Sequence, residues 1–110
     1  MTITYDDFDR VDIRVGEIVA VEDFPRARNP SYKVQVFFGD EIGSRWSSAQ
    51  ITSYPKAELI GRQVVAVVNF APKNIAGFMS ECLILGARMA DGQISTLTPS
   101  KTAVIGERVF

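Results

Sequence analysis

Residues 53–61 read Ser53-Tyr54-Pro55-Lys56-Ala57-Glu58-Leu59-Ile60-Gly61, and they hold the feature that best distinguishes between the possible folds of this chain. Its serine is a candidate helix cap, its proline suits the start of a helix, and its closing glycine commonly ends one. The stretch therefore predicts one short helix. Residues 62–70 follow it directly, are rich in valine and predict a strand that is buried on both faces.

Ahead of this helix, residues 11–21 predict a long strand. Val11, Ile13 and Val15 alternate with polar residues, and the apolar series then changes register around Gly16. We expect a bend at this glycine. Such a bend lets one strand curl between the two sides of a small barrel, whereas a flat sheet has no use for it.

Two more strands precede the helix. Residues 24–30 carry two prolines and two arginines and predict a basic loop. Apolar and polar residues alternate over residues 32–38, which predict the second strand. Residues 39–43 then predict a turn into a third strand near residues 45–51, so that these two strands form a hairpin.

The two ends of the chain carry weaker signals. Thr4 can accept a hydrogen bond from the backbone N–H of Asp7, which predicts a short helix over residues 5–9. Residues 78–85 and 93–97 predict two further strands, and residues 99–110 predict an extended tail.

The order of these elements is three strands, one short helix and two strands. This is the chain order of the five-stranded Greek-key barrel known as the OB-fold, with its helix between strands 3 and 4. We therefore predict an all-β OB-fold with N- and C-terminal extensions. An up-and-down barrel and a sandwich remain the alternatives, but neither requires that helix.

Length and composition limit the function. A chain of 110 residues with 46% hydrophobic and 23% charged residues predicts a single domain over residues 1–110. The sequence holds no histidine, which excludes imidazole catalysis and the commonest zinc sites. Cys82 lies in an apolar run and is expected to be a buried structural residue. We expect no enzyme, no catalytic residue, no metal and no cofactor.

The location of the protein is expected to be cytoplasmic. Its first residues lack the basic and apolar regions of a secretory signal. The longest apolar runs are far shorter than the roughly 20 residues that span a bilayer, so no membrane insertion is expected.

Charge is divided unevenly along the chain. Residues 1–25 hold seven acidic and two basic residues, whereas residues 26–88 hold eight basic and four acidic ones. Because the formal net charge is −1, binding of nucleic acid would require a local patch, and no DNA partner is expected. The alternative is that these charges are ordinary solvated surface residues.

Aromatic residues lie between the basic ones. Tyr32 precedes Lys33, and Trp46 follows Arg45. Phe70 and Phe78 lie on either side of Lys73 in the sequence, a few residues away. Rings that stack on bases and cations that hold phosphates suit single-stranded or looped RNA. The alternative places Phe70 and Phe78 in the core, and Trp46 is the ring most expected at the surface.

Three segments resemble the tRNA-binding domain family. They are Asp12-Ile13-Arg14-Val15-Gly16, Ser47-Ser48-Ala49-Gln50-Ile51 and residues 67–81, which include Asn69-Phe70-Ala71-Pro72-Lys73-Asn74-Ile75-Ala76-Gly77-Phe78. The resemblance covers about residues 6–110. It implies an OB-fold that forms a homodimer through its terminal extensions and has no catalytic activity. It also implies tRNA contacts from Asn69, Lys73 and Ser80.

The sequence departs from the pattern of the tRNA binders in ways that favour one branch of the family, the protein-secretion chaperones. Ala71, Asn74 and Ala76 stand where basic residues are usual, and Glu81 follows Ser80 directly. Fewer phosphate contacts imply weaker tRNA binding. The chaperone branch resembles peptide binders with an apolar groove near the dimer interface.

Two functions are therefore predicted. The first is a homodimeric chaperone that binds unfolded precursor proteins before export, with the peptide contacted by Trp46, Phe70, Ile75, Phe78 and Met79. Phe78 and Met79 could instead be ordinary barrel or interface core. The second is a structure-specific tRNA-binding protein with Lys33, Arg45, Asn69, Lys73 and Ser80 as its contacts. The apolar tail from Ala103 to Phe110 is expected to cover an edge strand of a second copy.

Overall fold

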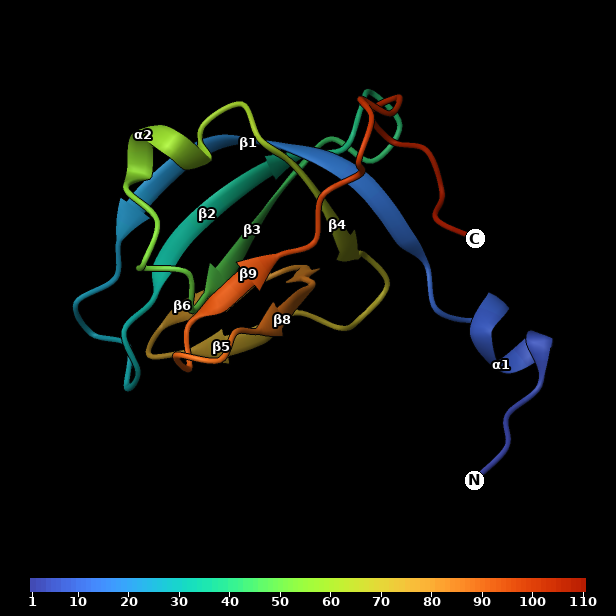
Figure 1. The fold of residues 1–110 in the computed structure, drawn as a ribbon, viewed down its shortest axis with the longest axis horizontal. Helices are drawn as coiled ribbons and strands as arrows, with labels where there is room; N and C mark the ends of the chain where they lie inside the picture. Colours follow the sequence, from blue (N-terminus) through green and yellow to red (C-terminus); the bar gives the residue numbers. More distant parts are fainter.

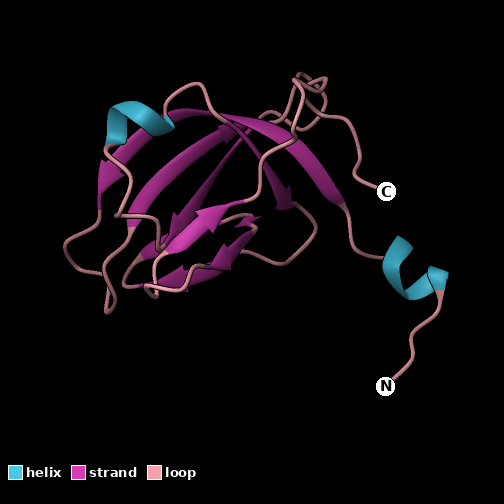
Figure 2. Ribbon diagram, in the orientation of Figure 1, coloured by secondary structure: helices cyan, strands magenta, loops and turns pink.

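The computed structural model describes residues 1–110, and it is a nearly closed antiparallel β-barrel with two short helices (Figures 1 and 2). Its elements in chain order are α1 (Tyr5–Asp9), β1 (Ile13–Asp23), β2 (Tyr32–Phe37), β3 (Ser44–Ala49), α2 (Lys56–Leu59), β4 (Gln63–Val67), β5 (Lys73–Ile75), β6 (Phe78–Ser80), β7 (Leu83–Ile84), β8 (Gly86–Arg88) and β9 (Ile94–Thr96). The all-β OB-like fold predicted from the sequence is confirmed, with α2 between the third and fourth strands.

The main sheet has the strand order β3-β2-β1-β4-β7, in which every neighbouring pair is antiparallel. The long strand β1 makes this arrangement possible, because its first half pairs with β4 and its second half with β2. Two short hairpins, β5–β6 and β8–β9, complete the structure. No helix of the structure has the length and the apolar character needed to cross a membrane.

The core fills the barrel with branched and aromatic side chains. Ile18, Val34 and Val64 are fully inaccessible to solvent. Leu59 of α2 is also fully inaccessible and packs into the same core. Burying each such side chain contributes about 1.5–3 kcal/mol relative to leaving it exposed. The alternation seen in the sequence of β2 is thereby explained, because every second residue faces this core.

The register change of β1 lies at a different residue from the one predicted. The bulge falls between Ile18 and Ala20, so that the extra residue is the exposed Val19 rather than Gly16. Gly16 is instead required by packing, because a Cβ there would lie 2.4 Å from Cγ1 of Val36. The bend was predicted correctly, but its position was wrong because periodicity shows a shift of register without locating the bulged residue.

The helix predictions are confirmed with one correction. Thr4 caps α1 by accepting the N–H of Asp7, and the Asp7 carboxylate accepts the N–H of Thr4 in return. In α2 the N-cap is Pro55, which has no side-chain cap, so the capping role expected of Ser53 was wrong. Gly61 follows α2 with a φ of +86°, as expected of a glycine that ends a helix.

The region after β4 differs most from the prediction. The single strand expected over residues 78–85 is divided into β6 and β7, which belong to different sheets. β6 pairs with β5, a strand that the sequence did not predict, through a two-residue turn at Ala76 and Gly77. Both turn residues have positive φ, as a two-residue hairpin loop requires.

Part of the C-terminal tail covers an edge within its own chain. Gly106 donates to the carbonyl of Val15, Val15 donates to that of Glu107, and Val109 donates to that of Ile13. The tail thus lies along the half of β1 that β2 leaves free. The expectation that the whole tail would be supplied to a second copy was wrong for these residues, whereas Val104 and Phe110 remain exposed.

Candidate functional site

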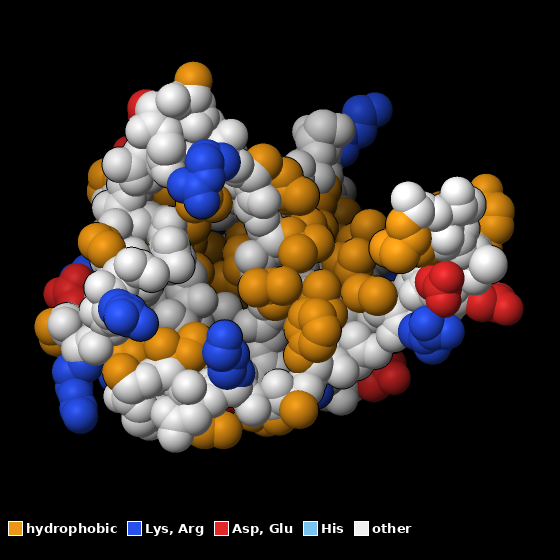
Figure 3. Space-filling view, turned by 90° about the horizontal axis from the view of Figure 1, so that it is seen from below, with side chains coloured by type: hydrophobic (Ala, Val, Ile, Leu, Met, Phe, Trp, Pro, Cys, Tyr) orange, Lys and Arg blue, Asp and Glu red, His pale blue; other side chains and the backbone are white.

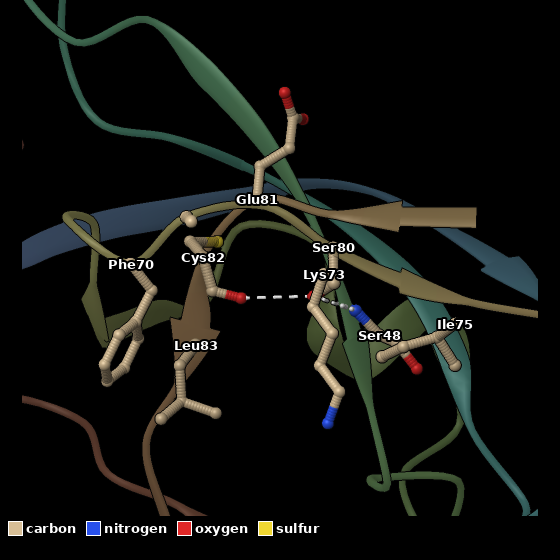
Figure 4. Close-up of a pocket in the computed structure, with 9 residues that line it drawn as sticks. Ser48, Phe70, Lys73, Ile75, Ser80, Glu81, Cys82 and Leu83 are labelled. Carbon is tan, nitrogen blue, oxygen red and sulfur yellow. Dashed lines mark hydrogen bonds between the residues drawn. The ribbon is translucent and has the colours of Figure 1, made fainter. Parts of the chain in front are cut away.

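The candidate site is a cavity of about 510 Å³ at the base of the β5–β6 hairpin, here called the hairpin cavity (Figure 4). It lies where the barrel closes, between β3 and the chain that leads from β6 into β7. Its lining is mostly apolar and consists of Ser48, Phe70, Ala71, Lys73, Ile75, Ser80, Glu81, Cys82 and Leu83. A hollow of this volume and character is typical of binding pockets.

Local structure places these side chains. Lys73 and Ser80 are cross-strand partners in the hairpin, so they stand side by side. Phe70 comes from the loop between β4 and β5 and is 58% exposed, while Leu83 lies on β7. Figure 4 shows Phe70, Leu83 and Lys73 projecting to the same side of the chain. An extended ligand would meet apolar surface with one ammonium group beside it.

The acidic residue of the lining does not face this ligand surface. Glu81 projects to the opposite side from Lys73 (Figure 4), and its carboxylate accepts the N–H of Trp46 at 2.9 Å. Lys73 takes part in none of the four ion pairs of the structure. The charge presented to a ligand at the hairpin cavity is therefore positive.

A second, smaller hollow lies at the tip of the same hairpin, and its lining includes Lys33, Phe24 and Phe78. The Nζ of Lys33 lies 5.1 Å from the ring centre of Phe24 and 5.2 Å from that of Phe78, which are cation–π distances. The two phenyl rings meet edge to face, and Phe78 meets Trp46 in the same way. Lys33, Trp46 and Phe78 thus form one cluster beside the hairpin cavity.

The other residues predicted to bind ligand lie apart from the hairpin cavity or have internal partners. Arg45 donates from Nη1 to the carbonyl of Val68 at 2.7 Å, inside the fold. Asn69 is exposed, and both ends of its amide bond the N-terminal segment. Met79 is exposed on β6 but lines neither hollow.

Of the ten predicted residues, the hairpin cavity brings together four: Phe70, Lys73, Ile75 and Ser80. The core alternative for Phe70 is wrong, because this ring is exposed. Trp46, the ring most expected at the surface, is half-buried, as is Phe78.

Sequence reasoning missed several residues of the cavity, among them Ser48 and Leu83. The run from Cys82 to Leu85 was taken only as an apolar strand, yet Cys82 is buried and the adjacent Leu83 is exposed. Residues 82–85 are all apolar in the sequence, so no sequence signal distinguished the exposed Leu83 from its neighbours. Burial raises the pKa of the Cys82 thiol to about 12, so Cys82 is the buried structural residue that was expected.

The face seen in Figure 3 carries a hollowed, largely hydrophobic area with Lys and Arg side chains beside it. Large exposed hydrophobic residues of the chain include Phe70, Met79, Leu83, Leu97 and Phe110. Exposed apolar areas of this kind mark interaction surfaces in proteins that are otherwise well packed.

Comparison with known proteins gives consistent matches. A family model described as a putative tRNA binding domain matches residues 13–108. The solved structure of the CsaA chaperone protein from Picrophilus torridus is 51% identical with a TM-score of 0.94, over 99% of this chain and 100% of that one. The chaperone CsaA from Bacillus anthracis is 40% identical with a TM-score of 0.92, over 100% of both chains.

Larger proteins also contain a similar segment. The methionine–tRNA ligase of Pyrococcus abyssi is 39% identical over 99% of this chain, and the match covers 15% of the ligase. This chain therefore spans only a small part of the length of that curated relative.

Proposed function

Since this chain belongs to the tRNA-binding domain family, we propose that it is a chaperone of the CsaA kind, which binds unfolded precursor polypeptides in the cytoplasm as a homodimer and has no catalytic activity. The observation that carries this proposal is the lining of the hairpin cavity. It is mostly apolar, Lys73 is the one cation in it, and the carboxylate of Glu81 is turned away and bonded to Trp46.

An unfolded polypeptide suits this lining because it exposes apolar side chains that a folded protein buries. Phe70, Ile75 and Leu83 offer them a partly exposed apolar surface. Removing apolar area from water contributes about 25 cal/mol per Å². The likeness to the two CsaA chaperone structures over whole chains supports the same function.

The homodimer is supported by apolar side chains at both ends of the chain. Ile3 and Tyr5 of the N-terminal arm (residues 1–12) are exposed, and so are Val104 and Phe110 of the tail. A further apolar hollow of about 360 Å³, lined by residues that include Val65 and Leu97, reaches Phe110. A second copy of the chain could bury these groups through a two-fold contact.

The experiment is a titration followed by fluorescence anisotropy, with a labelled, permanently unfolded polypeptide as probe. Phe70→Ser should weaken binding about tenfold or more, because an exposed anchor of the cavity is lost. Ile60→Ser is the matched control, since Ile60 is also an exposed apolar residue but lies at the end of α2. Equal binding by the two variants and the unaltered protein would contradict the proposal.

The second candidate function is binding of tRNA, and a specific observation favours it. Lys33 and Lys73 both lie beside the hairpin, and neither takes part in an ion pair with a carboxylate. Phosphates could bind these two ammonium groups, and also the Ser80 hydroxyl once it releases the carbonyl of Cys82. The side chains of Arg45 and Asn69 already bond partners within the chain. Such binding would weaken with added salt. The logarithm of the affinity should fall linearly with the logarithm of the salt concentration, with a slope of roughly one for each phosphate contacted.

A further inference from the structure

The barrel closes along a seam between β3 and residues 80–82. A single hydrogen bond joins the two main chains across it, from the N–H of Glu81 to the carbonyl of Trp46 at 2.7 Å. By contrast, β2 pairs with β3 along six consecutive residue pairs. One edge of β3 therefore lacks a full neighbouring strand.

Side chains take the places that a strand would fill on this edge. The carboxylate of Glu81 accepts the N–H of Trp46 at 2.9 Å. The hydroxyl of Ser80 accepts the N–H of Ser48 at 3.3 Å and donates to the carbonyl of Cys82 at 3.4 Å. The N–H groups of Trp46 and Ser48 are thus satisfied by side chains that can rotate away, whereas the carbonyl of Trp46 is held by the main chain of Glu81.

The hairpin cavity lies directly along this edge. Ser48, Ser80, Glu81 and Cys82 all belong to its lining, together with the apolar groups already described. An extended segment in the cavity would have the edge of β3 within reach of its own backbone. Unpaired strand edges are the usual templates for the addition of another strand.

From this geometry we infer that an unfolded polypeptide binds by adding a strand to β3 at Trp46 and Ser48, displacing the side chains of Glu81 and Ser80 and breaking the one main-chain hydrogen bond from Glu81 to Trp46. The inference rests on the proposed chaperone function and specifies how the ligand is held. Carbonyl groups of the ligand accept the two N–H groups, and its N–H groups donate to carbonyls of β3. Alternate side chains of the ligand then enter the apolar cavity.

This mode of binding explains how one cavity can serve many polypeptides. Main-chain hydrogen bonds are the same for every sequence, and the cavity requires only that alternate side chains be apolar. The ligand is therefore predicted to be an extended segment with apolar residues at every second position.

Removing one of the displaced side chains tests the inference, because strand addition predicts a rise in affinity rather than a loss. Because Glu81 competes with the ligand for the N–H of Trp46, Glu81→Ala should tighten binding of the unfolded polypeptide by about two- to tenfold, the worth of one hydrogen bond. Glu58→Ala is the control, since Glu58 lies in α2. Weaker or unchanged binding by a Glu81→Ala protein that melts like the unaltered one would overturn the inference.

The closing experiment uses the unaltered protein and therefore does not depend on how a variant folds. The probe is a labelled synthetic peptide in which leucine and serine alternate, with charged ends. It is made in two further versions, N-methylated at the odd or at the even amides. Strand addition predicts that one version loses at least tenfold in affinity and the other does not, because only every second N–H faces β3.

The outcomes separate this inference from the proposed function. Equal affinity of all three peptides would overturn strand addition and leave polypeptide binding intact. If the unmethylated peptide and an unfolded protein both fail to bind, the proposed function itself is wrong.

Discussion

The side-chain carbonyl of Asn69 accepts the backbone N–H of Asp12 at 3.0 Å, although the two residues are 57 positions apart in the chain. The other end of the same amide donates to the carbonyl of Arg10 at 2.7 Å. Asn69 thus fastens the N-terminal arm to the end of β4, one residue before Phe70 of the hairpin cavity. Arg108 bonds the same arm at the carbonyls of Asp9 and Val11.

Asn69→Ala should therefore loosen the arm. Loss of both hydrogen bonds at this exposed site should lower the free energy of unfolding by about 1 kcal/mol and speed hydrogen exchange at the Asp12 amide. Urea denaturation and exchange measured by mass spectrometry test this. Asn29→Ala is the control, because the Asn29 side chain makes no hydrogen bond in the structure. Unchanged exchange at Asp12 would mean that Asn69 does not hold the arm.

Gly16→Ala tests the close packing of β1 against Val36 and Phe38. The new methyl group would lie 2.4 Å from Cγ1 of Val36 and 2.8 Å from the ring of Phe38. Overpacking of this kind destabilises a core by about 1–3 kcal/mol. Val36→Ala should relieve part of this loss in the double variant, so a double-mutant cycle in urea should give a clear coupling energy. Strictly additive effects would contradict the close contact.

Cys82 predicts how stability changes in alkali. Burial raises the pKa of its thiol from 9.0 to about 12, so above pH 9 the unfolded chain loses this proton while the folded chain keeps it. The free energy of unfolding should therefore fall between pH 9 and about pH 12 through this group, and not below pH 9. Cys82→Ala should show a smaller decline over that range. If the free energy of unfolding fell equally with pH in both proteins, the fold would not protect the thiol from deprotonation.

The N-terminal arm predicts the state of association. Deleting residues 1–9 removes the exposed Ile3 and Tyr5, and on the proposed account it should shift a homodimer toward monomer. Sedimentation equilibrium over a range of protein concentrations measures this. Asp6→Ser is a control, because it changes the exposed face of α1 without removing apolar area. Sedimentation of the undeleted chain as a monomer would refute the dimer.

Local signals predicted much of the fold. The Thr4 cap, the alternation in β2 and the glycine that ends α2 each act over a few residues, and each was predicted correctly. The β5–β6 hairpin was missed because Pro72, Asn74 and Gly77 together are typical of a loop, and its strands have only three residues each. Pairing across the turn, rather than propensity, stabilises such short strands.

The site was predicted less completely than the fold for a physical reason. Residue type indicated that Arg45 and Asn69 could bind a ligand, but the partners that occupy them, Val68 and the N-terminal arm, are distant in sequence. In the same way, the position of Glu81 next to Ser80 in the sequence indicated that its carboxylate would repel a bound phosphate. In the structure that carboxylate accepts the N–H of Trp46 instead. Only tertiary structure decides which polar groups remain free.

The most direct test of the proposed function measures an unfolded polypeptide and a tRNA on the same preparation of protein, each across a series of salt concentrations. The proposed function predicts polypeptide binding that changes little with salt and is weakened about tenfold or more in Phe70→Ser, with weaker tRNA binding that falls as salt rises. Tight, salt-sensitive tRNA binding that Lys73→Ala abolishes, together with no binding of the polypeptide, would contradict it.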